Sequence, residues 1–416
     1  MKKIKVVHIC SSLGGGAGLC AARIMRATSS LGIDNYVLVK KGDSNNHIDV
    51  IDKNRAKNRI LFYIQKFLHH FYLWPKARWI DYKIEKAILN HDIVGYFTSP
   101  KSEYRISDHQ WISEADIIHI HWVGGFLDYD SFFKKVKKPI VWTLHDENPG
   151  LGGFHYSLWK KMSTPKGQQI DYKLALIKKE AYSHVKSMHM VAISSMMKEF
   201  ITRNELLGKF PCTLIHNGID ENSFRKINKI TAREALGIAS DKLVFMFIAD
   251  MIFDKRKGLK DLIYALEKLN LPNTTLICIG QYDTIPKTTF KILCEGFVSN
   301  SRLLSLYYSA ADFFMMPSYQ EAFAQTPMEA MSCGTPVIAY PCSGAHDLIK
   351  PLNGIVCRNF TTEALMDAIK EAINKQYDRN EIRQNVVENY SYSKIAKQYV
   401  ELYESILNTD NNKIVK

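Results

Sequence analysis

Long apolar runs, paired cysteines and acidic residues are all scarce in this sequence of 416 residues. No apolar run approaches the roughly 18–20 residues of a membrane-spanning helix, so we expect none. None of the eight cysteines belongs to a C-x-x-C pair, which predicts buried free thiols in a reducing compartment. Basic residues outnumber acidic ones by 55 to 42, and the net charge of +13 favours anionic partners such as phosphorylated substrates, lipid surfaces or nucleic acid.

The sequence also leads us to expect no secretion signal. The N-terminus, MKKIKVVHICSS, holds only a short apolar stretch that runs into glycines, without the cleavage site that a signal peptide needs. It is typical of a first strand, and we expect a cytoplasmic chain. Apolar residues at 46% and charged residues at 23% are typical of a soluble globular protein, and the length suggests two or three domains.

Short apolar runs alternate with amphipathic stretches along the chain. The runs begin at Ile4, Tyr36, Ala115, Pro139, Met188 and Cys212, and then at Leu243, Thr274, Phe290, Ala311, Pro336 and Asn353. Strands that alternate with helices form parallel sheets, so the pattern predicts an α/β protein with two doubly wound, Rossmann-like domains joined near residue 230. Because ligands bind at the carboxyl ends of such strands, we expect two facing domains to share one central cleft.

Residues 53–86 interrupt the first domain with many basic and aromatic residues. Mixed with leucine and isoleucine, they suit a helix that lies on an anionic membrane surface. A packed helix pair with a solvated face explains the same composition, and both interpretations stay open.

The segment EAFAQTPMEAMSCGTPVIA, which begins at Glu321, carries the strongest chemical pattern. Thr326 is positioned as a helix N-cap, with Pro327 at the first helical position and Glu329 three residues beyond the cap. Free N–H groups at the start of such a helix attract a diphosphate, and the two glutamates can accept hydrogen bonds from sugar and ribose hydroxyls. The plainer interpretation makes Glu329 a capping partner and Glu321 a solvated loop residue.

This segment resembles the E-x7-E signature of the family 4 glycosyltransferases, which are retaining enzymes of the GT-B fold. ADIIHIHW, PIVWTLHD, HNGID at 216–220 and DKRKGLKDLIYAL resemble other strings of that family, in the same order. HWVGGF, WTLHDENP and GGFHY resemble members that build bacterial capsular, exopolysaccharide or lipopolysaccharide sugars. The resemblance implies an acceptor-binding domain over residues 1–228, a nucleotide-sugar-binding domain over 229–391, and a C-terminal helix over 392–416 that crosses back to the first domain.

The resemblance also implies roles in the second domain. Glu321 would hydrogen-bond hydroxyls of the donor sugar, and Glu329 would hold the nucleotide ribose. Lys257 would stabilise the departing diphosphate. The backbone amides beside it would be those of Phe323, Ala324 and Gln325.

In the first domain the resemblance implies three site residues. His145 would lie at the sugar near the reacting carbon, although it could instead only hold the HDENP turn. Gly15 and Gly16 would let the backbone approach the donor phosphate or the acceptor.

Two positions depart from the family pattern. The family usually has glycine where Ala324 stands, so the alanine methyl group could narrow the diphosphate loop unless the backbone needs no positive φ there. The family often has arginine where Met251 stands, and Arg256 could supply the missing charge.

The implied chemistry needs no metal and no other cofactor. The leaving group would be UDP or GDP, stabilised by Lys257, Arg256 and helix N–H groups. The acceptor would be a saccharide linked to a polyprenyl lipid, in bacterial surface polysaccharide biosynthesis. His119 and His121 share one face of a strand and could bind a metal with His145 or His155, but no usual carboxylate or thiolate ligand accompanies them, so we predict no metal site.

Three other functions remain as alternatives. Gly16, Gly18 and Ala21 satisfy the G-x-G-x-x-A pattern of an NAD(P)-dependent oxidoreductase, and Lys40 and Lys41 could accept a 2′-phosphate. A sugar-nucleotide epimerase would share the fold. A non-enzymatic basic binding protein would use the positive charge and residues 53–86, but no nucleic-acid partner is expected because no RNA-binding signature is present.

Overall fold

The computed structural model of the protein describes residues 3–51, 76–282 and 284–414. The chain forms two compact units. Unit 1 consists of Met1–Ile215 together with Ala396–Lys416, and unit 2 consists of His216–Ile395. The chain therefore changes unit at the HNGID turn and changes back near the start of its last helix.

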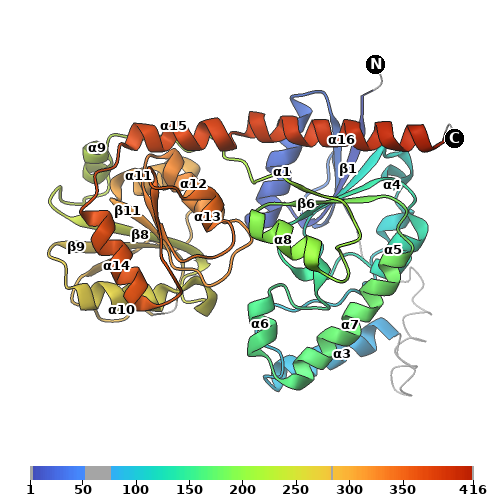
Figure 1. Cartoon of the computed structure of the whole chain (residues 1–416), viewed down its shortest axis with the longest axis horizontal. Coiled ribbons are helices and arrows are strands. Elements are labelled where there is room, and N and C mark those ends of the chain that lie inside the picture. Colours follow the sequence, from blue (N-terminus) through green and yellow to red (C-terminus); the bar gives the residue numbers. More distant parts are fainter. Residues whose placement is uncertain (1–2, 52–75, 283, 415–416) are drawn as a thin grey trace. The chain divides into compact units, whose positions relative to one another are not determined.

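Unit 1 is built on a seven-stranded parallel sheet in the order β3-β2-β1-β4-β5-β6-β7. Strands β1 and β6 of this sheet are labelled in Figure 1. Its strands are β1 (Lys5–Ser12), β2 (Asp34–Lys41), β3 (Ile48–Val50), β4 (Ile117–Ile120), β5 (Ile140–Leu144), β6 (Met188–Ala192) and β7 (Cys212–Leu214). Its helices are α1 (Gly15–Ser29), α3 (Lys76–Leu89), α4 (Gln110–Glu114), α5 (Tyr129–Lys135), α6 (Ser157–Met162), α7 (Pro165–Ser183) and α8 (Ser195–Arg203). Every apolar run predicted as a strand in this half is one, and the short β3 is the only strand among its described residues that was missed.

Unit 2 repeats the topology with a six-stranded parallel sheet in the order β10-β9-β8-β11-β12-β13. Its strands are β8 (Leu243–Met251), β9 (Thr274–Gln281), β10 (Lys291–Cys294), β11 (Phe313–Met316), β12 (Val337–Ala339) and β13 (Gly354–Val356). Its helices are α9 (Lys229–Ala235), α10 (Leu259–Leu269), α11 (Ser301–Ala310), α12 (Gln325–Ser332), α13 (Ala345–Leu348), α14 (Thr362–Ile373) and α15 (Arg379–Tyr390). The last helix, α16 (Tyr392–Ile414), begins in unit 2 and belongs to unit 1 from Ala396 onward. Both strand orders are of the doubly wound, Rossmann-like kind, which confirms the predicted fold class.

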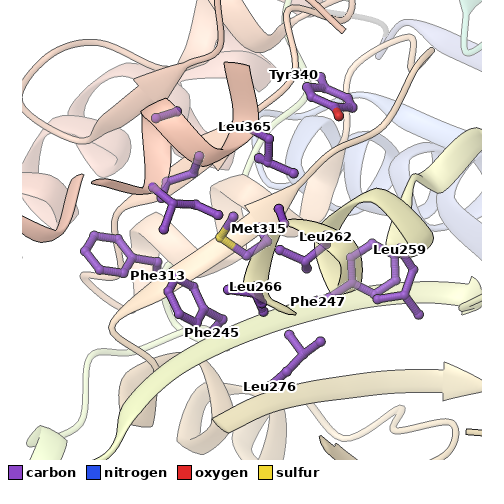
Figure 2. Packing of buried hydrophobic residues seen from close by; sticks show 14 of the residues in the cluster. Phe245, Phe247, Leu259, Leu262, Leu266, Leu276, Phe313, Met315, Tyr340 and Leu365 are labelled. Atoms are coloured by element: carbon purple, nitrogen blue, oxygen red, sulfur yellow. The ribbon is translucent and has the colours of Figure 1, made fainter. Parts of the chain in front are cut away.

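The core of unit 2 explains why its strands could be located from sequence. Phe245 and Phe247 of β8 point to the same face, where Leu262 and Leu266 of α10 and Leu365 of α14 cover them (Figure 2). All five are at most 2% exposed. Because β8 is buried on its other face too, its sequence is a nearly continuous apolar run. This packing holds the carboxyl ends of β8 and β11, from which the loops of the candidate site emerge.

Two expectations from composition can be compared with the fold. Among the described residues, no helix is long and apolar enough to cross a membrane. All eight cysteines are free, and all are buried except Cys212 and Cys294, which are partly exposed.

The basic and aromatic stretch at 53–86 is only partly described. Residues 53–75 lie outside the described residues, so the membrane-surface prediction stays a prediction. In the described part, Ile84 and Ala87 of α3 pack into a hydrophobic cluster with Ile93, Phe97 and other residues of unit 1. This end of the stretch is a packed helix, as the plainer interpretation held.

The predicted start of α12 is wrong by two residues. The helix begins at Gln325, its N-cap is Ala324, and no side chain caps it, so Thr326 is not the cap. Pro327 is tolerated at the third helical position because the first-turn amides have no partner within the helix. The predicted end is confirmed, because Gly334 follows the helix with φ of 79°.

Candidate functional site

In unit 2, two loops at the carboxyl edge of the sheet approach each other closely. After β8, residues Lys255–Lys257 form a short 3-10 helix, capped by the Asp254 carboxylate, which accepts a hydrogen bond from the Arg256 amide at 2.9 Å. Gly258 ends it with φ of 72°, and a Cβ atom there would lie 2.0 Å from the carbonyl oxygen of Pro317. Only glycine allows this approach, which brings the loop after β8 against the loop after β11.

Gly258→Ala should therefore lower stability more than an ordinary left-handed glycine replacement does. Gly237→Ala is the matched control, because Gly237 has φ of 63° but nothing within 4 Å of a Cβ atom. The control should cost about 1–2 kcal/mol from backbone strain alone, and Gly258→Ala should cost clearly more. Urea unfolding of both variants checks this, and equal losses would show that the loops separate without penalty.

Glu321 lies where these two loops meet, with two cations bound to one of its oxygens. Lys257 Nζ lies 2.6 Å and Arg256 Nη1 lies 3.0 Å from Glu321 Oε1. Arg256 also donates to the carbonyl of Gln320 at 2.7 Å, and its own carbonyl accepts from the Tyr319 amide at 2.8 Å. Glu321 is only 8% exposed, so it is not the solvated loop residue of the plainer interpretation.

The charge state of Glu321 follows from these contacts. Burial alone would raise the pKa of its carboxyl group. The charges of Lys257 and Arg256, with hydrogen bonds from Lys257 and Ser318, outweigh burial and lower the pKa to about 2. Glu321 is therefore a carboxylate at neutral pH that can only accept hydrogen bonds.

The second carboxylate of the signature lies inside α12. Glu329 is 7% exposed, and its Oε2 accepts a hydrogen bond from the Tyr308 hydroxyl at 3.0 Å. Ala324 has φ of −69°, so the backbone there does not require glycine. Ala324 and Gln325 are partly exposed at the helix start, whereas Phe323 is buried and its carbonyl accepts from Asn217 Nδ2 at 3.2 Å.

Met251 ends β8 and is 49% exposed. It makes no charged contact that could replace the family arginine. Arg256, five residues later, is the arginine that contacts Glu321.

In unit 1, Gly15 and Gly16 begin α1 in an exposed turn. Gly15 has φ of 69°, and neither glycine has an atom within 4 Å of a Cβ position. Gly18 is the glycine that packing requires, because a Cβ atom there would lie 2.2 Å from the Ser12 carbonyl oxygen. The turn therefore leaves free space beside Gly15 and Gly16, whereas Gly18 packs directly against the end of β1.

His145 follows β5 and is linked to a buried cluster of histidines. Its Nε2 lies 3.2 Å from His121 Nδ1, and His121 Nε2 lies 2.9 Å from His8 Nδ1. Burial lowers the pKa of both His8 and His145 to about 4. Packing also places His119 beside them, with its two nitrogens 2.7 Å from the Tyr403 hydroxyl and 2.8 Å from the Thr143 hydroxyl.

Two groups of residues could be considered for a metal ion. His8, His119 and His121 place one nitrogen each within 4.8 Å of one another, although all six of their ring nitrogens already have hydrogen-bond partners. The sequence also contains one D-x-D triplet, Asp128 to Asp130. Asp128 caps α5 and Asp130 pairs with lysines, so that triplet has a structural role.

The predicted residues thus fall into two groups. Unit 2 brings together Arg256, Lys257 and Glu321, with Glu329 and the start of α12 following along the chain. Unit 1 holds Gly15, Gly16 and His145, each at the carboxyl edge of its sheet. Sequence reasoning missed the close approach at Gly258 and the contact of Tyr308, which join residues distant in sequence. It grouped His121 with His145 as a possible metal site, but it missed His8 and Asn35 behind them.

Two doubly wound units are the architecture of the GT-B fold, and solved structures share it. Sucrose-phosphate synthase from Thermosynechococcus elongatus is similar with a TM-score of 0.69 and 17% identity, covering 98% of this chain and 100% of that one. Anabaena HepE in complex with UDP-glucose has a TM-score of 0.63 and 17% identity, covering 97% and 100%. WaaG, described as a glycosyltransferase involved in lipopolysaccharide biosynthesis, has a TM-score of 0.56 and 16% identity, covering 98% and 99%.

The chain belongs to glycosyltransferase family 4. Residues 14–223 match the family model described as Glycosyltransferase Family 4, and residues 228–389 match the one described as Glycosyl transferases group 1. An uncharacterized glycosyltransferase of Methanocaldococcus jannaschii is 27% identical over 315 residues, which are 70% of this chain and 76% of that protein. Alpha-galactosylglucosyldiacylglycerol synthase of Streptococcus pneumoniae is 26% identical over 318 residues, 70% and 78% of the two chains. The oxidoreductase alternative has no support from this membership.

Proposed function

We propose that this glycosyltransferase transfers a sugar, with retention and without a metal, from a UDP- or GDP-linked donor to a lipid-linked saccharide in bacterial surface polysaccharide biosynthesis. The observation that carries the proposal is the cluster of Lys257 and Arg256 around the buried Glu321 carboxylate, four residues before α12. Two cations and the first-turn amides of a helix are the groups that a departing diphosphate needs.

In this reaction, the bond between the anomeric carbon and the β-phosphate oxygen breaks, and a bond to the acceptor oxygen forms on the same face. The acceptor proton goes to the departing phosphate oxygen, so no enzyme base is consumed. Lys257 and Arg256 stabilise the charge that develops on the nucleoside diphosphate. Glu321 accepts hydrogen bonds from donor-sugar hydroxyls, with its orientation fixed by Lys257.

The remaining site residues have supporting roles in the proposal. Glu329 accepts hydrogen bonds from the ribose diol, and the amides of Phe323, Ala324 and Gln325 face the diphosphate. In unit 1, Gly15 and Gly16 leave room for phosphate or acceptor, and His145 contacts a sugar hydroxyl. No residue in this scheme binds a metal ion.

The nature of donor and acceptor is supported by relatives. HepE was solved with UDP-glucose, the pneumococcal relative is named for a glycosylated diacylglycerol, and WaaG acts in lipopolysaccharide biosynthesis. Unit 1 also contains a cleft of about 700 Å³ between α3 and the loop at 96–104, lined in part by Lys40 and Lys101. Its lining also includes three carboxylates, those of Asp81, Glu85 and Glu103, so it offers both donors and acceptors to the hydroxyl groups of a saccharide. We propose that it belongs to the acceptor site.

Glu329→Gln should weaken binding of the preferred nucleotide sugar by about 10- to 100-fold, because the lost hydrogen bonds involve a charged acceptor. A thermal-shift titration with UDP, GDP and ADP, their sugar conjugates, NAD and NADP identifies the nucleotide. Tyr308→Phe is the matched control, since it removes the hydrogen bond to Glu329 but leaves the carboxylate. Its binding should change by less than about threefold.

The same titration separates the alternatives. A shift only with NAD or NADP would overturn the proposal, as would equal binding by wild type and Glu329→Gln. With the donor identified, transfer to a lipid-linked saccharide should persist in EDTA; a loss that magnesium restores would contradict metal independence. A donor epimerised without acceptor would indicate the epimerase.

A further inference from the structure

A diagonal row of four polar side chains crosses four neighbouring strands of the unit 1 sheet. It starts at Asn35 on β2, passes His8 on β1 and His121 just after β4, and ends at His145 just after β5. The strands follow one another in the order β2-β1-β4-β5. The row therefore runs from the interior of the sheet to its carboxyl edge, where ligands bind in this fold.

The strand register explains why these side chains meet. Asn35 lies opposite Val6, two residues before His8. His8 lies opposite His119, two residues before His121, and His119 lies opposite Val141, four residues before His145. Every offset is even, so all four side chains point to the same face of the sheet.

Hydrogen bonds join the row into one continuous chain. Asn35 Oδ1 lies 2.8 Å from His8 Nε2, and His8 Nδ1 lies 2.9 Å from His121 Nε2. His121 Nδ1 lies 3.2 Å from His145 Nε2. Asn35, His8 and His121 are at most 5% exposed, whereas His145 is partly exposed.

The orientation of the Asn35 amide sets the direction of the whole chain. Its Nδ2 donates to the Met25 carbonyl at 3.0 Å and to the Thr28 hydroxyl at 2.9 Å. A carbonyl can only accept, and the Thr28 hydroxyl already donates to the Ile24 carbonyl at 2.9 Å. Asn35 must therefore turn its NH₂ group toward them and its oxygen toward His8.

The protons of the three imidazoles follow in order. An oxygen facing His8 Nε2 requires the proton on that nitrogen, so His8 Nδ1 accepts. His121 must then carry its proton on Nε2 and accept at Nδ1. His145 in turn must carry its proton on Nε2. Among the described residues, none makes a hydrogen bond to His145 Nδ1.

We infer that Asn35, His8 and His121 are positioning residues, which fix His145 as the Nε2–H tautomer and present its Nδ1 as an acceptor for a substrate hydroxyl. The catalytic consequence rests on the proposed function, whereas the tautomer does not. In neutral form at physiological pH, His145 then orients the hydroxyl without taking its proton, which suits a transfer that needs no enzyme base.

The test uses full-length protein labelled with ¹⁵N histidine, in which long-range ¹H–¹⁵N spectra distinguish the two tautomers. The His145 signals are assigned by their loss in His145→Gln. Wild type should show a protonated Nε2 and an unprotonated Nδ1 at His145. His8→Leu should give a mixture of tautomers, because His121 loses its acceptor. His8→Gln should restore the wild-type pattern, since its amide can donate to Asn35 and accept from His121.

His119→Leu is the matched control. His119 is as buried as His8 and lies opposite it in the sheet, but its partners are Tyr403 and Thr143. This variant should lose stability and keep the His145 tautomer. In activity assays, His8→Leu should lower kcat at least about tenfold relative to His119→Leu, with KM for the donor little changed and activity recovered in His8→Gln.

Three outcomes would overturn the inference. A protonated Nδ1 at His145 in wild type would reverse the deduced direction. An unchanged tautomer in His8→Leu would show that the chain does not control it. Stoichiometric metal that is lost in His8→Leu would mean that the imidazole lone pairs bind an ion instead. The spectra do not depend on turnover, so they stand even if the proposed transfer reaction fails.

Discussion

Replacing Lys257 by methionine is expected to lower kcat by about 10²- to 10³-fold, the usual loss when one preorganised electrostatic group is removed from a developing anion. Methionine keeps the length of the side chain and removes the charge 2.6 Å from Glu321 Oε1. The effect should fall on kcat more than on the KM for the donor, because charge on the diphosphate grows mainly in the transition state. Steady-state kinetics with the identified donor measures it.

The fold should survive this change. Arg256 remains 3.0 Å from the same oxygen, so Glu321 is not left buried without a cation. Lys255→Met is the control, because Lys255 is exposed in the same short 3-10 helix. It should retain activity within about twofold. A Lys257→Met enzyme within about threefold of wild type would instead assign the leaving-group charge to Arg256 and the helix amides.

The fold was predictable because most strands, such as β4, β5 and β11, are short, apolar and buried on both faces. The apolar residues of such runs are continuous and do not recur at helical spacing, so they are not mistaken for amphipathic helices. The bounds of β8 and β11 were therefore predicted to within two residues. The start of α12 was predicted less well, since Thr326 and Pro327 form a plausible cap locally. The extended backbone at Ala324 begins the helix two residues earlier without a side-chain cap.

The site was predictable only where its residues are close in sequence or match a known motif. Glu321 and Glu329 belong to one segment, whereas the approach of Gly258 to Pro317 joins residues 59 apart, and no local pattern reveals it. The partners of His145 required the strand register. Once β1, β4 and β5 are aligned, the even offsets of His8, His121 and His145 become visible, but sequence alone does not determine that alignment.

The buried histidines should make unit 1 the acid-sensitive part of the chain. The pKa of His8 is lowered by burial from 6.5 to about 4. Burial also lowers the pKa of His119, His121 and His189. Because the unfolded chain binds more protons between these values, the stabilising contribution is present above pH 6.5 and is lost as the pH falls toward 4. His8 alone accounts for about 3 kcal/mol, an upper figure for a fully buried group.

Unit 2 should respond in a different pH range, which supplies a control within the same molecule. The lowered pKa of Glu321 contributes to the free energy of unfolding. This contribution is complete above the unfolded pKa of about 4.3 and is lost as the pH falls toward 2.

All six tryptophans lie in the first 159 residues, so tryptophan fluorescence reports unit 1 selectively. In urea unfolding of the full chain, the fluorescence midpoint should fall steeply between pH 6.5 and 5. Circular dichroism reports both units, so a transition that it shows without a matching change in fluorescence belongs to unit 2, and the midpoint of that transition should change little over that range. In His8→Gln, the free energy of unfolding of unit 1, obtained from fluorescence, should depend less on pH, by up to about 1.4 kcal/mol per pH unit. If the urea midpoint measured by fluorescence did not change with pH, these histidines would be protonated without loss of the fold. That result would contradict their buried, neutral, hydrogen-bonded arrangement.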